Sequence, residues 1–225
     1  MTKDIEKLLS SKVLSSQLYL ESLTHRSASN KNNELLEFFG DAILGFIIAE
    51  FLFNKYPADD EGSLSRKRSY IVRKETLSKV AKDLDIGNKI ILGEGEKKSG
   101  GSRRDSIISD ALEAIIAVVY IVDGFEEARN FIYNIFKNYL EKLPADNDLK
   151  DSKTKLQEFL QAQNCELPNY ETEEIILKNE IYFKTICKII KYKIHEEGIG
   201  SSKRKSQQEA ASRALEKINN MDIKS

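Results

Sequence analysis

The sequence predicts a multidomain protein, in which an all-α domain is followed by a small α+β domain with the element order α-β-β-β-α. Three observations support this fold class. Up to about Leu143, segments of helical length follow one another with few glycines and prolines. A short polar stretch at 144–152 then has the composition of a linker between domains. The segments beyond it are rich in Ile, Tyr, Thr and Phe, which favour strands.

Turn signals separate the helices that are expected in the first domain. Tyr56–Gly62 contains Pro and Gly, and Gly93–Gly101 contains four glycines, so the latter is expected to be an irregular loop. The predicted helices are Asn33–Asn54, Ser63–Leu84, Ser106–Val122 and Glu126–Leu143.

Two helices and three strands are expected in the second domain. A short amphipathic helix is predicted at Thr154–Gln163 and a closing helix at Lys203–Ile218, which follows a loop at Gly198–Ser202. The predicted strands are Tyr170–Leu177, Ile181–Ile190 and Lys191–His195.

Composition narrows the classes of function. With 40% hydrophobic and 32% charged residues the chain has a soluble, foldable composition, and its net charge of -1 does not by itself indicate a nucleic-acid partner. Cys165 and Cys187 have no second Cys or His at metal-ligand spacing, which argues against zinc and favours reduced thiols. The N-terminal segment does not look like a signal peptide, and the longest apolar runs are well below the roughly 20 residues of a membrane span. We therefore expect a cytoplasmic protein with no membrane partner.

Carboxylates lie on helices that are otherwise apolar. Ile107–Val122 contains only two charged residues, Asp110 and Glu113, and their spacing of three places them on one face. A helix that is apolar nearly all round is a buried helix. Two like charges in such a helix are costly unless a cation neutralises them.

A second apolar helix repeats the pattern. Within Asn33–Phe53, Glu34, Glu37 and Asp41 share one face, whereas Glu50 lies elsewhere on the wheel and is expected to be solvated. Two helices that each present carboxylates suggest a shared site, and oxygen-only ligands favour Mg²⁺ or Mn²⁺. The alternative is that these carboxylates form a solvated helix edge or pair with arginines.

Two arginines in the neighbouring loop keep that alternative open. Arg103 and Arg104 lie in the loop just before the helix that carries Asp110 and Glu113. They could supply ion pairs to the carboxylates, or they could receive a phosphate.

The last predicted helix begins with three cations. Ser202 is a suitable N-cap, but Lys203, Arg204 and Lys205 in the first turn oppose the helix dipole. This arrangement suits an anion that docks at the helix start, where backbone N–H groups and cations together bind phosphates. The alternative is an ordinary solvated run of charges.

Several motifs in order make the chain recognisable. Asn33–Leu44 (NELLEFFGDAIL) resembles the signature of the ribonuclease III family, and nearly the whole chain is similar to the bacterial form of that family. The last 70 or so residues look like a double-stranded RNA-binding domain. The other matching stretches are Leu23–Ser27, Asp60–Gly62, Lys98–Gly101, Asp110–Ala114, Thr154–Gln161 and Gly198–Ala211.

The resemblance implies a homodimeric endonuclease that hydrolyses both strands of duplex RNA with Mg²⁺, for which Mn²⁺ can substitute. It implies products with 5′-phosphate and 3′-hydroxyl ends and a part in rRNA and mRNA processing. The implied domains are an all-α endonuclease domain at 2–127 with a helical tail to about 143, a linker at 144–152, and an RNA-binding domain at 153–221.

The resemblance also implies roles for particular residues in metal binding, cleavage, dimer contact and RNA binding. The metal ligands would be Glu37, Asp41, Asp110 and Glu113, of which Asp41 and Glu113 match the pair assigned as essential for catalysis. Glu34 and Glu61 match two further acids near the cleavage site, and Phe38 matches an aromatic residue inserted into the dimer partner. The RNA-binding residues would be Thr154, Gln157, Glu158, Gln161, Ser202, Lys203 and Arg204.

The chain departs from the family pattern at three places. Leu35 replaces a residue that is usually basic, and Gln207 replaces the last basic residue of the helix-start motif. The loop Lys178–Glu180 lacks the Gly/Pro-plus-His element that enters a minor groove in the family, so weaker and more salt-sensitive RNA anchoring is expected there.

Two rival functions remain. One is a catalytically inactive relative that only binds or scaffolds double-stranded RNA, but all six acidic positions are present. The other is an unrelated two-metal phosphohydrolase with an RNA-binding appendage, against which the ordered motifs argue.

Overall fold

The structure, a computed structural model, describes residues 4–222. The chain divides into two compact units, Met1–Pro144 and Ala145–Ser225. Each unit has its own cluster of buried apolar side chains, and the two clusters share no residue. The units are therefore described separately.

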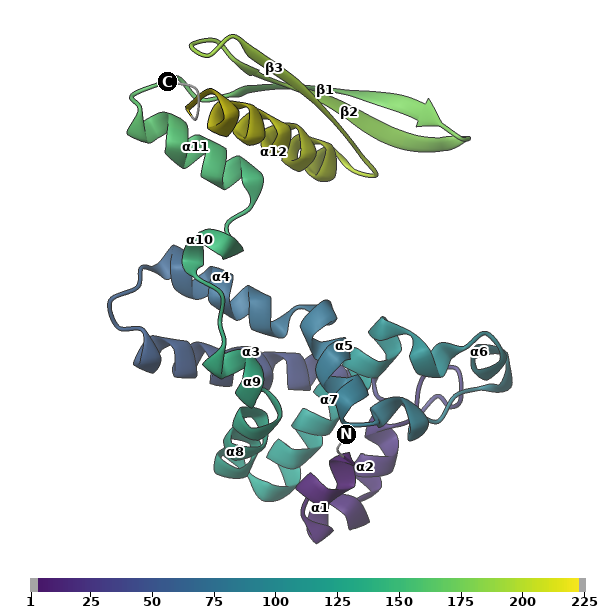
Figure 1. The fold of residues 1–225 in the computed structure, drawn as a ribbon. Coiled ribbons are helices and arrows are strands. Elements are labelled where there is room, and N and C mark those ends of the chain that lie inside the picture. Colours follow the sequence, from purple (N-terminus) through teal and green to yellow (C-terminus); the bar gives the residue numbers. More distant parts are fainter. Residues whose placement is uncertain (1–3, 223–225) are drawn as a thin grey trace. The chain divides into compact units, whose positions relative to one another are not determined.

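The first unit is built from helices (Figure 1). Thr24 and Ile91 form an isolated parallel β-bridge that joins two of its loops. The α-helices are α1 Ser11–Ser15, α2 Gln17–Ser22, α3 Glu34–Lys55, α4 Glu61–Val72, α5 Lys74–Asp83, α6 Glu94–Lys98, α7 Asp105–Asp123, α8 Phe125–Ile135 and α9 Lys137–Glu141; the 3-10 helices are η1 Ile5–Leu8, η2 Ile86–Asn88 and η3 Gly101–Arg103.

The two apolar helices, α3 and α7, form the centre of this unit. From Ile107 to Val119 every residue of α7 except Asp110 is buried, as expected for a helix that is apolar nearly all round. Gly40 of α3 lies against the backbone of Glu113, and a Cβ at position 40 would be 1.8 Å from the Glu113 carbonyl oxygen. Glycine therefore sets how closely the two helices approach. None of the helices described is both long and apolar enough to cross a membrane.

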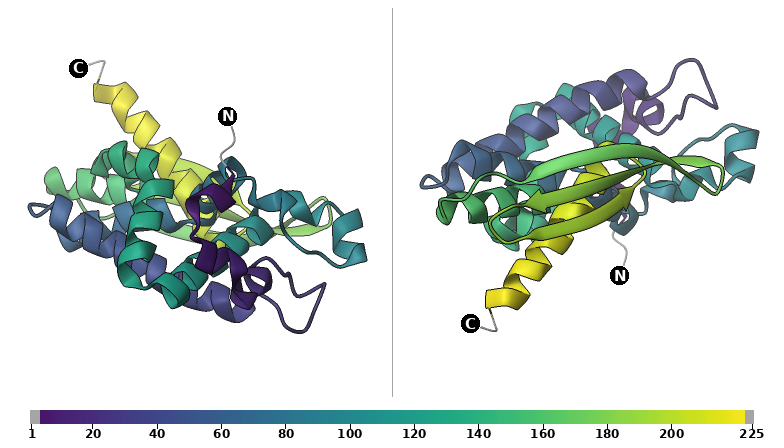
Figure 2. Two further views of the ribbon diagram at one scale, coloured as in Figure 1. Left: turned by 90° about the horizontal axis from the view of Figure 1, so that it is seen from below. Right: turned by 90° about the horizontal axis from the view of Figure 1, so that it is seen from above.

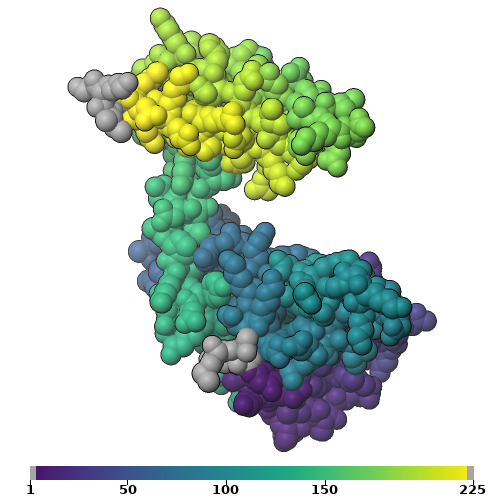
Figure 3. All heavy atoms as spheres, turned by 45° about the vertical axis from the view of Figure 1, so that its right-hand side comes forward, coloured from purple at the N-terminus to yellow at the C-terminus, as the bar shows by residue number. Residues whose placement is uncertain are grey.

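The N-terminal segment is fastened to the rest of the unit. Ile5 is fully buried and its N–H donates to the carbonyl of Leu84 at 3.3 Å. The Lys89 ammonium lies 3.1 Å from the carboxylates of both Asp4 and Glu6. The purple segment in Figure 3 accordingly lies against the blue and teal parts of the same unit.

Several predicted boundaries in the first unit were wrong. Ser63–Leu84 is two helices, because Arg73 is extended (ψ 150°) and the Thr76 hydroxyl donates to the carbonyl of Tyr70 at 2.8 Å, in place of a helical N–H. Glu126–Leu143 is likewise divided, at the buried Phe136. The expected irregular loop Gly93–Gly101 contains α6.

The second unit has the predicted order α-β-β-β-α, with one extra helical turn before it. A three-stranded antiparallel sheet in the order β1-β2-β3 carries α11 and α12 on one face, and the right-hand view of Figure 2 looks onto the other face. The elements are α10 Asp146–Leu149, α11 Ser152–Ala162, β1 Asn169–Leu177, β2 Glu180–Ile189, β3 Ile194–Gly200 and α12 Lys203–Asp222.

The predicted bounds of the third strand, Lys191–His195, were wrong, because β3 begins later, at Ile194. Lys191–Lys193 forms a turn, and the strand extends to Gly200. The predicted loop at Gly198–Ser202 is thus largely strand. The physical reason is a close approach, because a Cβ on Gly198 would lie 2.3 Å from the backbone of α12 at Ala210. Glycine here indicates tight strand–helix packing and not a loop.

The hairpin between β1 and β2 is tighter than expected. Leu177 pairs with Glu180, so the turn consists only of Lys178 and Asn179 and not of Lys178–Glu180. Both turn residues have positive φ, at 51° and 63°, as in the two-residue turns that suit strand twist.

Candidate metal centre and nucleic-acid interface

Three of the four predicted metal ligands meet between α3 and α7. Glu37 of α3 and Asp110 and Glu113 of α7 each offer a carboxylate oxygen, and these oxygens lie within 4.8 Å of one another. Glu113 is 7% exposed, whereas Glu37 and Asp110 are half-buried. The close helix approach at Gly40 brings the carboxylates together.

Asp41, the fourth predicted ligand, lies outside this group of oxygens. It follows Glu37 by one turn of α3 and its side chain is exposed. Its negative charge still acts on Glu113, where it is the strongest of the neighbouring charges that raise the pKa. Asp41 therefore lies at the solvent edge of the acidic group, which consists of Glu37, Asp110 and Glu113.

The electrostatics of the group call for a cation. Burial, together with the charges of Asp41, Asp110 and Glu37, raises the pKa of Glu113 to about 8. Burial and the charge of Asp110 also raise the pKa of Glu37. Lys74 lies 3.4 Å from Asp110 but its side chain is 64% exposed, so it neutralises the buried carboxylates poorly. A donor set made only of carboxylate oxygens suits a hard divalent ion.

The acidic group borders a cleft of about 690 Å³. Glu37 and Asp110 line it together with His25 and Arg26, from the loop after α2, and Glu96 of α6. His25 and Arg26 lie in Leu23–Ser27, which matches the family, but periodicity gives no position for side chains on an irregular loop, so no role was predicted for them.

The arginines of the cleft are paired with carboxylates outside the acidic group. Arg104 lies 2.7 Å from Glu96, and Arg26 lies 3.3 Å from Glu34. Both arginines also line the cleft and remain more than half exposed. The alternative in which Arg104 pairs with the α7 carboxylates is therefore not what the structure shows.

Glu61 and Glu50 lie apart from the acidic group. Glu61 is the exposed first residue of α4 and lines a separate, largely apolar pocket with Phe53 and Leu64. Glu50 was expected to be solvated, and this was wrong: it is half-buried, 4.0 Å from Arg129, with one carboxylate oxygen buried.

An apolar stripe runs along the exposed side of α3. Leu35 is 81% exposed, Phe38 77%, Phe46 60% and Phe53 71%. Leu35, Phe46 and Phe53 are separated by 11 and then 7 residues, which is the spacing of a helix–helix seam. Exposed apolar side chains gathered in this way indicate a surface that another molecule covers.

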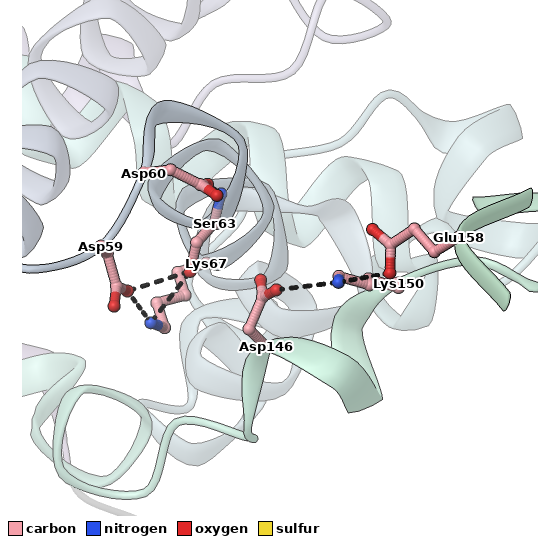
Figure 4. Close-up of polar contacts among 7 residues, drawn as sticks. All are labelled: Asp59, Asp60, Ser63, Lys67, Asp146, Lys150 and Glu158. Atoms are coloured by element: carbon pink, nitrogen blue, oxygen red, sulfur yellow. Dashed lines mark hydrogen bonds and ion pairs between the residues drawn. The ribbon is translucent and has the colours of Figure 1, made fainter. Parts of the chain in front are cut away.

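The predicted RNA-binding residues of α11 share one face of that helix. Gln157, Glu158 and Gln161 are exposed and Thr154 is half-buried. Glu158 accepts a hydrogen bond from Lys150 at 2.7 Å, and Lys150 is also 3.7 Å from Asp146, so α10 and α11 are linked (Figure 4).

The start of α12 has the expected cap and the expected cations. The Ser202 hydroxyl accepts from the N–H of Lys205 at 3.2 Å, and Lys203 and Arg204 are exposed. Gln207 has another role, because its side chain accepts from Lys153 at 2.6 Å and donates to Thr172 at 3.5 Å. It links α11, β1 and α12 within the unit.

Comparisons with known proteins agree with this arrangement. A family model described as Ribonuclease-III-like matches residues 15–140, and a double-stranded RNA binding motif matches 152–218. Ribonuclease 3 of Nitrosococcus oceani is 43% identical over 221 residues, which cover 96% of this chain and 95% of that protein. Ribonuclease 3 of Actinobacillus pleuropneumoniae is 44% identical over 217 residues, covering 95% and 96%.

A solved structure supports the same conclusion for the first unit. The nuclease domain of ribonuclease III from Campylobacter jejuni, in which a region involved in dimer formation shows structural flexibility, is 37% identical. The match covers 62% of this chain and 100% of that one, with a TM-score of 0.56. Because the curated relatives match over almost their full length, the chain belongs to the ribonuclease III family.

Proposed function

We propose that this ribonuclease III, an endonuclease of double-stranded RNA, hydrolyses phosphodiester bonds with Mg²⁺ bound at Glu37, Asp41, Asp110 and Glu113. The observation that carries the proposal is the acidic group of Glu37, Asp110 and Glu113 beside a cleft. A cation bound there would favour the charged form of the buried Glu113 carboxyl, whose pKa burial and the neighbouring carboxylates raise to about 8.

Each carboxylate has a distinct part in the proposed mechanism. When bound, Mg²⁺ supplies a lowered pKa for the attacking water and charge stabilisation for the leaving 3′-oxygen; Mn²⁺ would serve similarly. Glu113 anchors the site from the buried side, and Glu37 and Asp110 hold it at the cleft wall. We assign to Asp41, whose side chain is exposed, the further role of orienting the attacking water by accepting its hydrogen bond.

The second unit binds the RNA substrate in this proposal. We assign Thr154, Gln157, Glu158 and Gln161 to contacts with 2′-hydroxyls, since they share one face of α11. We assign Ser202, Lys203 and Arg204 to phosphates, because the capped start of α12 presents N–H groups and exposed cations together. Glu34 and Glu61 support the cleavage site in this proposal.

The active form would be a homodimer that cuts both strands and leaves 5′-phosphate and 3′-hydroxyl ends. The apolar stripe of α3, which includes Phe38, supports self-association, because its seam spacing suits a second α3. We further propose that precursors of rRNA and mRNA are the substrates and that the protein acts in the cytoplasm.

One assay tests the proposal. The protein is incubated with long duplex RNA, single-stranded RNA or duplex DNA, each with Mg²⁺ or EDTA. We expect cleavage of duplex RNA alone, and only with Mg²⁺. Cleavage that persists in EDTA would contradict the metal mechanism, and duplex binding without cleavage under every condition would identify a non-catalytic RNA-binding protein.

A further inference from the structure

Lys67 is the one lysine among the buried residues of the described chain, with 7% of its surface exposed. A buried ammonium is costly unless it is paired and hydrogen-bonded. Apolar side chains of similar volume often replace a buried ion pair with no loss of stability. The charge at position 67 therefore calls for an explanation other than core packing.

The contacts of Lys67 converge on the segment that joins α3 to α4. Its ammonium forms an ion pair with Asp59 and lies 3.2 Å from the Ser63 hydroxyl (Figure 4). It also lies 4.3 Å from the centre of the Tyr56 ring. The Ser63 hydroxyl donates in turn to Asp59 at 2.9 Å. The ammonium thus ties the end of α3 to the first two turns of α4.

Glu61 stands in the middle of this tied segment. Before it, Asp59 is held by Lys67, and Asp60 caps α4 by accepting from the N–H of Ser63 at 2.6 Å. After it, Ser63 is held by both Asp59 and Lys67. The side chain of Glu61 is exposed while the chain on each side is fixed.

We infer that Lys67 is a positioning residue, whose ammonium fixes the Tyr56–Asp60 loop so that Glu61 is held at a set place relative to α3. The inference rests on the proposed role of Glu61 in supporting cleavage. It assigns to Lys67 no contact with RNA, because its side chain is buried.

Single-turnover cleavage of one defined RNA duplex in Mg²⁺ tests the inference. Lys67→Met keeps the length of the side chain and removes its charge. We expect the cleavage rate constant to fall between about tenfold and a hundredfold, as small misplacements do, while the KM for duplex RNA stays unchanged. Lys67→Arg, which can still reach Asp59, should recover most of the rate.

A double-mutant cycle separates positioning from general stability. Glu61→Gln should slow cleavage, and adding Lys67→Met to it should cause no further loss, because the group being positioned is already disabled. Lys89→Met is the matched control, since it breaks ion pairs with Asp4 and Glu6 in the same unit and should leave the rate constant unchanged. Asp59→Asn serves as a second variant should Lys67→Met not fold.

The outcomes are distinct. A normal rate constant for both Lys67→Met and Asp59→Asn, beside a slow Glu61→Gln, overturns the inference and leaves the proposed function intact. Independent, multiplicative losses in the double mutant also overturn it, since they show a role outside Glu61. A normal rate for Glu61→Gln overturns the assigned role of Glu61 and the inference with it.

Discussion

Glu113 is buried beside the carboxylates of Glu37 and Asp110, which is why we propose it as a metal ligand. Lys74, a cation that lowers its pKa, is largely exposed. The sequence indicated this much, since a charge in the middle of an apolar helix is costly without a partner. It could not indicate that Asp41 would lie at the edge of the acidic group, because that depends on how α3 and α7 cross.

Replacing Glu113 by Gln should abolish cleavage and leave duplex binding intact. The variant removes one ligand and one charge while keeping the size of the side chain, and the RNA-binding residues lie in the other unit. A gel-shift titration and a cleavage assay on the same duplex would measure both properties. Near-normal cleavage by the variant would refute the ligand role.

The same variant should change how stability depends on pH when metal is removed. Folding raises the pKa of Glu113 from 4.5 to about 8. Below about pH 4.5 the carboxyl is protonated in both states and has little effect; as pH rises towards about 8 the unfolded chain releases the proton and the folded chain retains it, so folding is increasingly disfavoured. In EDTA, Glu113→Gln should thus be more stable than the parent by a margin that grows with pH.

Urea unfolding at about pH 5 and about pH 8 would measure this margin, which should reach a few kcal/mol at the higher pH. If the difference in the free energy of unfolding between the variant and the parent stays constant or shrinks, ionisation of Glu113 does not destabilise the folded state. Adding Mg²⁺ should reverse the order at the higher pH, because the parent alone retains the full ligand set.

At the scale of elements, the crossing of α3 and α7 decides the geometry of the site. Gly40 allows the approach, whereas Gly45, on the same helix, faces open space. The pair offers a matched comparison, because both glycines are helical. Replacing glycine by alanine at an open helix position stabilises the helix by about 1 kcal/mol.

Gly40→Ala should destabilise the protein by roughly 1–3 kcal/mol or more, because the new methyl group collides with the Glu113 backbone and forces the helices apart. Gly45→Ala should be neutral or stabilising. Thermal unfolding of both variants, together with their cleavage rates, would test the point. Equal melting temperatures for the two would contradict the close-approach argument.

The start of α12 carries a prediction about RNA affinity. Lys203→Ala and Arg204→Ala should each weaken duplex binding for all sequences and reduce the slope of log affinity against log salt by about 1. Arg213→Ala, on the same helix but paired with Glu209 at 2.9 Å, is the control and should leave the slope unchanged. Binding isotherms at several salt concentrations would show the difference.

Hydrophobic periodicity predicted the long helices, because α3 and α7 bury continuous apolar faces. It did not predict the breaks at Arg73 and Phe136, since neither position carries a glycine or proline. Gly198 was predicted to lie in a loop but lies in β3, because a sequence does not distinguish a glycine in a turn from a glycine that packs closely under a helix. The acidic group was predictable from misplaced charge, and Arg104 was recognised as a possible ion-pair partner, but its pairing with Glu96 and the place of Arg26 in the cleft were not predicted.

At the scale of the whole molecule, self-association is the main consequence of the exposed stripe on α3. Phe46→Asp places a charge in the middle of the stripe and should convert a dimer into a monomer. Ile176→Asp alters a side chain that is 76% exposed in the second unit and should leave the assembly unchanged. Sedimentation at micromolar concentration should give about twice the chain mass of 25.6 kDa for the parent and the control. A monomeric parent would contradict the dimer proposal.

The separation of the two cores also sets an order of events during synthesis. The last buried residue of the first core is Leu140, so everything that core requires has been made before the second unit begins. The second core, by contrast, needs Ala210, Ala214 and Ile218 of α12, which follows all three strands. The nuclease unit can therefore fold while the RNA-binding unit is still on the ribosome. Translation of an mRNA truncated within the α12 codons would therefore yield a folded nuclease unit joined to an RNA-binding unit that lacks part of its core and cannot fold.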